Sequence, residues 1–165
     1  MTKLEELKNL FRPPPAKETW ACELLPTGIC KGAITEVTGV GKAEFVVQLL
    51  QEHPTLHIAW IEEELTAYPI AFLQRNIALH RILFVEAKKH VAWACLNILK
   101  AQAFPITIVR QPSFELETLR RFQLASEKSN ASLLWLSPQP HRLWPIHQHI
   151  VIQKQATLRA KVMHH

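Results

Sequence analysis

Five short, nearly continuous apolar runs alternate along this chain with longer segments of helical periodicity. The runs cover residues 33–38, 57–61, 82–85, 106–109 and 132–136. A strand that is apolar at successive positions is buried on both faces, as in a parallel sheet covered by helices. Apolar residues at helical spacing predict helices at 43–52, 89–103 and 115–128. Repeated βα units of this kind predict an α/β fold of three layers with a mostly parallel sheet.

Several local features extend this pattern. Ser113 is expected to cap the last helix, because a serine side chain accepts a hydrogen bond from the free N–H groups of a helix N-terminus. After a proline-containing loop, residues 148–153 are expected to form a strand at the edge of the sheet. Trp60, Trp93 and Trp135 fall at positions that the pattern predicts to be buried in strands and helices.

The N-terminal residues differ from the rest of the chain. Leucine and phenylalanine at helical spacing predict a short amphipathic helix over residues 2–11, and three successive prolines end it. We therefore divide the 165 residues into 1–23, a helix with a proline-rich linker, and 24–165, a single folded domain.

Composition excludes several classes of protein. The chain is 48% hydrophobic and 20% charged, which is typical of a folded domain and not of a disordered one. No apolar run approaches the ~20 residues that span a bilayer, so we expect no membrane association. The three cysteines lack metal-ligand spacing, which predicts reduced thiols and a cytoplasmic location. A net charge of +5 is compatible with nucleic-acid binding but does not establish it.

All four glycines of the chain lie between residues 28 and 41. Glycine tolerates positive φ and close backbone approach, and here a strand, a glycine turn, Lys42 and a helix follow one another as in a phosphate-binding loop. The motif Gly-x-x-x-x-Gly-Lys-Ser/Thr is incomplete, because Glu36 replaces its first glycine and Ala43 its hydroxyl-bearing residue. The absence of aspartate agrees with this, since all fourteen acidic residues of the chain are Glu. The pattern predicts an NTPase scaffold that has lost its chemistry.

The same region resembles a known family. Residues 25–39 look like the glycine-rich turn and strand that lead into the phosphate loop of the RecA recombinases. Residues 58–69 are similar to the next strand of that family and its acidic turn, and residues 81–85 and 104–110 follow in the family's order. The resemblance extends over roughly residues 24–137, and it implies that the folded domain is RecA-like.

Matched residue by residue, the nucleotide site that this resemblance implies is damaged. Lys42 corresponds to the lysine of the phosphate loop, but three residues are missing between Gly39 and Gly41. A loop that short cannot easily curl its N–H groups around a phosphate. Arg110 stands where the family has the acidic residue that ends its Walker B strand, so a cation replaces a metal-binding anion.

The acidic turn carries the remaining residue of that site. Glu64 corresponds to the glutamate that activates water in the family, with Glu62 and Glu63 as alternatives of register. We also consider that this acidic run pairs with Arg110 and fills the former metal site as a structural ion pair. The losses together predict a pseudo-ATPase that uses no cofactor and no metal, and residual nucleotide binding remains an alternative.

Two smaller RecA relatives lack a working nucleotide site. Residues 119–138 look most like the corresponding helix and strand of ImuA, the RecA-like protein of translesion-synthesis operons, whereas the short length looks more like the cell-division inhibitor SulA. The resemblance to ImuA implies a non-catalytic interaction module of the bacterial SOS response whose partner is a recombinase or a translesion polymerase subunit. The alternatives are a SulA-like inhibitor that binds FtsZ, a weak ATP-binding switch and a single-strand DNA binder.

Candidate interaction residues lie outside the vestigial site. Aromatic and leucine residues near prolines or on the N-terminal helix are candidate anchors for a protein partner or a second copy of the chain: Leu4, Leu7, Phe11, Trp20 and Trp144. Clustered basic residues are the candidates for nucleic-acid contact: Arg75, Arg81, Lys88, Lys89, Arg120 and Arg121. His147 and His149 would share one face of a strand, but no Cys or Asp nearby completes a metal site, so none is predicted.

Overall fold

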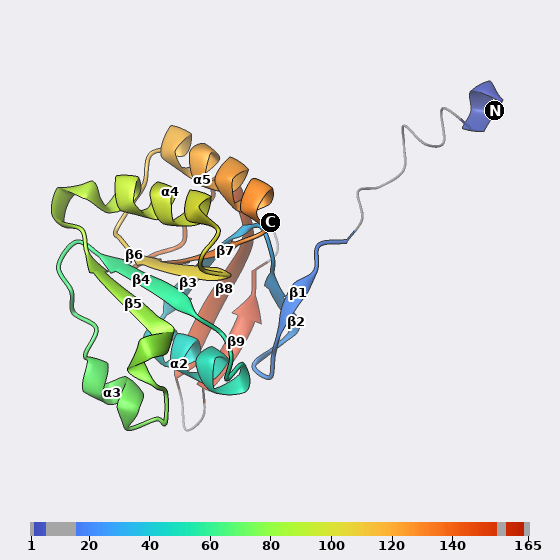
Figure 1. Cartoon of the computed structure of the whole chain (residues 1–165). Coiled ribbons are helices and arrows are strands. Elements are labelled where there is room, and N and C mark those ends of the chain that lie inside the picture. The colour runs from blue at the N-terminus through green and yellow to red at the C-terminus, as the bar shows by residue number, and fades with distance from the viewer. Residues whose placement is uncertain (1, 6–15, 155–157, 164–165) are drawn as a thin grey trace.

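The structure, a computed structural model, describes residues 2–5, 16–154 and 158–163. Its centre is a seven-stranded sheet (Figure 1). In spatial order its strands are β5 (Ile82–Glu86), β4 (Ile58–Glu62), β6 (Ile106–Arg110), β7 (Ser132–Leu136), β3 (Ile34–Gly39), β8 (Ile146–Lys154) and β9 (Leu158–Val162). The first six run parallel, and β9 pairs antiparallel with β8. The mostly parallel sheet predicted from the sequence is thus confirmed.

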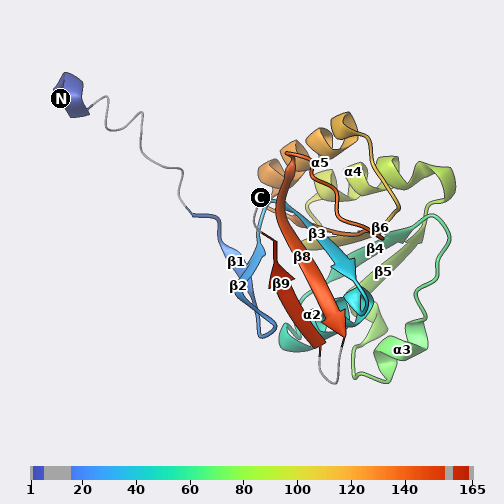
Figure 2. The same ribbon diagram turned by 180° about the vertical axis from the view of Figure 1, so that it is seen from behind.

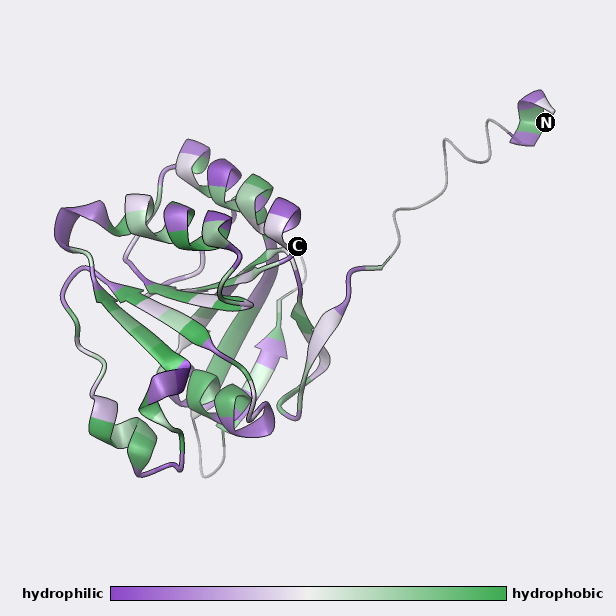
Figure 3. Cartoon of the chain, viewed as in Figure 1, coloured by the Kyte–Doolittle hydropathy of each residue, from purple (hydrophilic) through white to green (hydrophobic). Residues whose placement is uncertain are grey.

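Helices cover both faces of this sheet. The helices α4 (Val91–Ala101) and α5 (Leu116–Ser129) lie on one face. The other face carries α2 (Lys42–Glu52), the short α3 (Pro69–Leu73) and a separate hairpin of β1 (Thr19–Cys22) and β2 (Leu25–Cys30). Successive residues of β4 enter opposite cores, with Trp60 packed on the α2 side and Ile61 on the α4 side. The continuous apolar runs therefore reflect burial on both faces of the sheet. Green in Figure 3 marks the hydrophobic residues of these strands.

The five predicted strands and the three predicted helices are all present, with ends shifted by at most two residues. Two local predictions are wrong. Glu115, not Ser113, is the N-cap residue of α5, and its side chain makes no capping hydrogen bond. Trp93 was predicted to be buried but is 68% exposed, because α4 packs on the sheet through Val91, Ala94, Cys95 and Leu99 instead.

The strand predicted at 148–153 is not at the edge of the sheet. It belongs to β8, which lies between β3 and β9, as Figure 2 shows from behind. The sequence reading omitted β9, whose partly exposed residues form the true edge on that side.

The N-terminal part of the chain contains the β1–β2 hairpin, which the sequence analysis did not predict. Residues 3–5 are helical, whereas the rest of the predicted helix, with Leu7 and Phe11, lies outside the described residues. The β1–β2 hairpin pairs residues on both sides of the expected boundary at residue 23. No helix in the described residues is long and apolar enough to cross a membrane.

Candidate functional site

The turn between β3 and α2 holds the residues of the incomplete phosphate loop. Strand β3 ends at Gly39 and α2 begins at Lys42, so only Val40 and Gly41 lie between them. Gly39 and Gly41 both have φ of 94°, in the left-handed region that favours glycine. A Cβ atom on Gly39 would lie 2.1 Å from the carbonyl oxygen of Ile152 on the neighbouring β8. These glycines therefore serve a tight turn of two residues beside another strand.

An open pocket of about 400 Å³ lies over this turn and is basic. The residues that line it are Gly39, Val40, Gly41, Lys42, Ala43, Arg110 and Pro138. The pKa of Lys42 lies below its ordinary value, first because burial removes water from the ammonium group and second because Arg110 is positively charged. No acidic residue is among those that line the pocket, so it offers no carboxylate to a divalent cation.

Arg110 forms an ion pair with the buried Glu62 on the adjacent strand. The two residues are register partners across β6 and β4, and Arg110 Nη1 lies 3.5 Å from Glu62 Oε1. Glu62 is 2% exposed, and its carboxylate also accepts hydrogen bonds from Thr66 N (2.7 Å), Thr66 Oγ1 (2.8 Å) and Ala67 N (3.0 Å). The predicted pairing of Arg110 with the acidic run is confirmed for Glu62. Glu64, the residue matched by sequence, is exposed instead.

A second buried carboxylate, that of Glu36, lies in the middle of β3. Glu36 is 1% exposed, and its Oε1 accepts a hydrogen bond from His141 N at 2.9 Å. The ring nitrogen His141 Nδ1 lies 2.8 Å from Glu36 Oε2, and His149 Nδ1 lies 3.1 Å from Oε1. Burial alone would raise the pKa of Glu36, but hydrogen bonds from His149 and His141 outweigh it and hold that pKa below its usual range.

This cluster fixes the loop that joins β7 to β8. The ring of His141 stacks on the buried Trp135, with ring centroids 4.6 Å apart. Sequence reasoning noted His149 but did not connect it to Glu36, which lies 113 residues earlier in the chain. The available signal was a charged residue in the middle of an otherwise uncharged strand, because a buried charge requires a partner.

The comparisons with known proteins agree with this geometry at the level of the fold. No protein-family model matches the chain, and no curated protein matches its sequence. The crystal structure of the RadB recombinase is similar to it, with a TM-score of 0.68 and 15% sequence identity. The similarity covers 84% of this chain and 83% of that one. The fold is RecA-like. At this level of identity, the likeness shows the RecA-like fold alone.

The basic residues predicted to contact nucleic acid differ in burial and in their contacts within the chain. Arg81 is buried, and its guanidinium donates to the backbone carbonyls of Leu56 (3.0 Å) and Leu50 (2.8 Å), so it is structural. Three others form ion pairs within the chain: Arg75 with Glu44, Lys88 with Glu86, and Arg121 with Glu117. Lys89 is exposed, and Arg120 lies over the ring of Trp144 at 5.8 Å from its centroid.

The candidate partner anchors differ in their surroundings. Trp20 is half-buried in the hairpin, where its Nε1 donates to Ser132 Oγ at 3.3 Å and Lys31 lies over its ring. Leu4 and Trp144 are 62% and 61% exposed, as expected for anchors.

The histidine pair of β8 does not form a metal site. His147 is exposed and falls in a bulge between the Ile34–Ile146 and Thr35–Gln148 pairs, whereas His149 turns inward to Glu36. The bulge breaks the alternation that would have put both imidazoles on one face. Among the described residues, no group of three or more His, Cys, Asp or Glu side chains has an arrangement that could hold a metal ion.

Proposed function

We propose that this protein is a pseudo-ATPase that acts as a protein-interaction module. The observation that supports this best is the Arg110–Glu62 ion pair beside a turn of two residues. Mg²⁺ binds to carboxylates and phosphate oxygens, and a guanidinium at its place opposes it. Glu62 is also occupied by Thr66 and Ala67, so it is not free to orient water. Without a metal or a phosphate cradle, nucleotide hydrolysis has no basis in this site.

The cellular role that we propose is in the bacterial DNA-damage response. The RecA-like fold agrees with this role, and residues 119–138 resemble ImuA. The partner would then be a recombinase or a translesion polymerase subunit. A SulA-like inhibitor that binds FtsZ is the alternative within the same class.

A second candidate function is the binding of a small anion without metal. Lys42 and Arg110 bring two positive charges to one pocket, and Lys42 has no salt bridge within the described part of the chain. The N-terminus of α2 adds its partial positive charge. Inorganic pyrophosphate added with EDTA should raise the unfolding temperature of wild type and not of Lys42→Ala. Equal shifts in both proteins would rule this candidate out.

The proposed function is tested with purified full-length protein in two assays. The first measures ATP turnover with Mg²⁺, and we expect none above the buffer blank. Turnover that disappears in Lys42→Ala would contradict the proposal. The second measures binding to a purified recombinase, a translesion polymerase subunit and FtsZ by biolayer interferometry. Binding to one of the first two supports the ImuA-like role, binding to FtsZ alone supports the alternative, and binding to none rejects both.

A further inference from the structure

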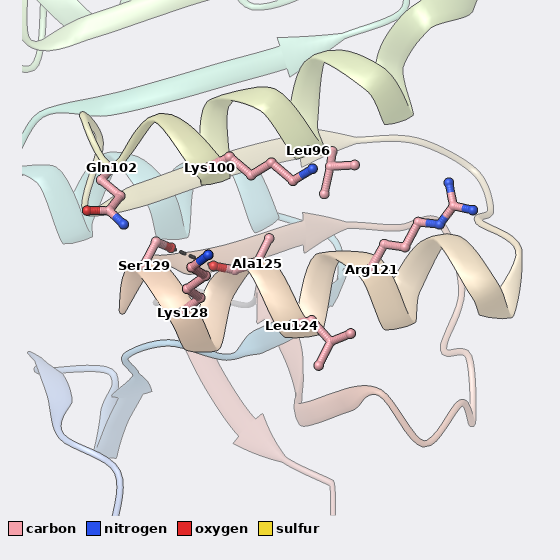
Figure 4. A pocket seen from close by; sticks show the side chains of 8 residues that line it. All are labelled: Leu96, Lys100, Gln102, Arg121, Leu124, Ala125, Lys128 and Ser129. Atoms are coloured by element: carbon pink, nitrogen blue, oxygen red, sulfur yellow. Dashed lines mark hydrogen bonds between the residues drawn. The ribbon is translucent and has the colours of Figure 1, made fainter.

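A groove of about 720 Å³ runs between α4 and α5 on the outer side of the helical layer. Leu96 and Lys100 reach it from α4, and most of the remaining lining comes from α5 (Figure 4). The residues that line it are Leu96, Lys100, Gln102, Arg121, Leu124, Ala125, Lys128 and Ser129. The groove is formed by other elements than the β3–α2 turn, and it shares no lining residue with the pocket over that turn.

The floor of the groove is apolar, and its most exposed apolar residue, Leu124, is not part of the hydrophobic core. Helix α5 packs on the sheet through Leu119, Phe122 and Ala125, which are almost fully buried. Leu124 is 56% exposed, so more than half of its side chain faces water, and Leu96 on α4 is half-buried. Covering such surface is favourable because it removes apolar atoms from water. The groove therefore retains hydrophobic surface that the folded chain leaves uncovered.

The charged residues of the groove all have the same sign. Lys100, Arg121 and Lys128 surround the apolar floor, and no acidic residue lines it. Arg121 pairs with Glu117 along α5 at 2.8 Å, but Lys100 and Lys128 make no salt bridge within the described residues. Both lysines lie in the last turn of their helices, where their positive charge also interacts favourably with the negative end of the helix dipole. That role needs only the positive charge and leaves both ammonium groups free to bind carboxylates.

We propose that this groove is a docking site for an acidic amphipathic segment of a partner protein. The apolar side of the segment would cover Leu96, Leu124 and Ala125, and its carboxylates would pair with Lys100 and Lys128. Apolar residues at helical spacing meet such a groove in helix-in-groove recognition. The inference rests on the proposed interaction function and names the surface and the chemistry of the partner.

The lining of the groove favours a peptide over single-stranded nucleic acid. None of the eight residues that line it is aromatic, and base stacking on aromatic side chains is the main sequence-tolerant contact to single strands. The exposed Trp93 and Trp144 are not among them. Basic groups around an apolar floor match a ligand that has both carboxylates and hydrocarbon.

The experiment is a selection of peptides on the immobilised full-length chain. The probe is a phage-displayed library of random peptides about 16 residues long, enough for four helical turns. We expect the enriched peptides to combine Asp or Glu with Leu, Ile or Phe at intervals of three and four residues. The best peptide is then labelled with a fluorophore, and its dissociation constant is measured by anisotropy.

Two groove variants and two matched controls locate the binding site. Lys100→Glu/Lys128→Glu should weaken peptide binding at least about tenfold, and Leu124→Ser about fivefold, as is usual for central interface contacts. Lys89→Glu/Lys161→Glu changes the net charge equally on other elements, and Leu116→Ser removes an exposed leucine from α5 outside the groove. Both controls should change the affinity less than about twofold, within the range of peripheral contacts.

Three results would overturn the docking proposal. They are a failure to enrich peptides, enrichment of peptides without acidic residues, and equal affinity for wild type and Lys100→Glu/Lys128→Glu. A labelled oligo-dT that binds wild type and is lost in the same double variant would instead identify a nucleic-acid surface. ATP turnover alongside intact peptide binding would reject the pseudo-ATPase and leave the groove in place, so the two failures are distinguishable.

Discussion

The two buried carboxylates of the sheet and the two lysines of the α4–α5 groove differ in how the protein compensates their charge. Glu36 is surrounded by His141 and His149, and Glu62 by Arg110 and the backbone that follows β4. Lys100 and Lys128 have no such partners within the described residues. Charge compensated inside the fold contributes to stability, whereas uncompensated charge beside an apolar floor is available to a ligand.

The comparison predicts that Glu36 contributes most to stability. Glu36→Ala would leave two histidines without their buried carboxylate, and we expect it to lower the free energy of unfolding by about 3 kcal/mol. Urea unfolding followed by tryptophan fluorescence measures this. The matched control, Glu63→Ala at an exposed site, should change it by less than about 0.5 kcal/mol. A loss below that limit in Glu36→Ala would show that the cluster is not structural.

The lowered pKa of Glu36 also predicts an acid-sensitive stability. A carboxyl group whose pKa is lower in the folded state stabilises the protein above its unfolded pKa, and this stability is lost as pH falls through the folded pKa. Urea midpoints measured between about pH 6 and pH 3 should therefore fall in wild type, in the range where carboxyl groups titrate. In Glu36→Gln this fall should be smaller. Identical pH profiles would contradict the assigned direction.

At the Arg110–Glu62 ion pair we expect a smaller effect. Arg110→Asp would place a second carboxylate beside the buried Glu62, and repulsion should lower the free energy of unfolding by about 1–2 kcal/mol, a discounted figure because Arg110 is partly exposed. Arg110→Gln, which retains a donor for Thr66, should lose less. Chemical denaturation of the three proteins provides the measurement. A more stable Arg110→Asp would be evidence against a structural ion pair.

The smallest effect on stability is expected in the groove. Lys100→Glu/Lys128→Glu should change the free energy of unfolding by less than about 1 kcal/mol, because surface charges contribute little. Thermal and urea unfolding of this variant would therefore separate loss of binding from loss of folding. A large destabilisation would mean that the lysines, like Glu36, serve the fold.

Local sequence patterns predicted the fold well where burial is uniform. Strands such as β4 and β7 are buried at every position, and their apolar runs were sufficient to locate them. Helix α4 is apolar on two sides, and no local pattern reveals that the Trp93 side lacks a neighbour. Strand β9 alternates between half-buried and exposed residues, so its sequence gave no comparable signal.

The candidate site was predicted only in part, because its decisive contacts are distant in sequence. The incomplete glycine motif and the arginine at position 110 are visible within a few residues of sequence. The pairing of Arg110 with Glu62 instead of Glu64 depends on the register of β4 against β6, which local patterns do not fix. The Glu36 cluster requires the loop after β7 to fold back over β3, and the groove requires two helices to lie side by side.

We propose that Mg²⁺ and nucleotide do not bind together at the β3–α2 turn. Thermal unfolding of wild type and Lys42→Ala, each with millimolar ATP in either Mg²⁺ or EDTA, tests it most directly. Ligand at ~100 times its dissociation constant adds about 2.7 kcal/mol, which is a shift of several degrees for a domain of this size. We expect that Mg²⁺ adds nothing to the unfolding temperature of either protein. An Mg²⁺-dependent rise in wild type that disappears in Lys42→Ala would contradict it.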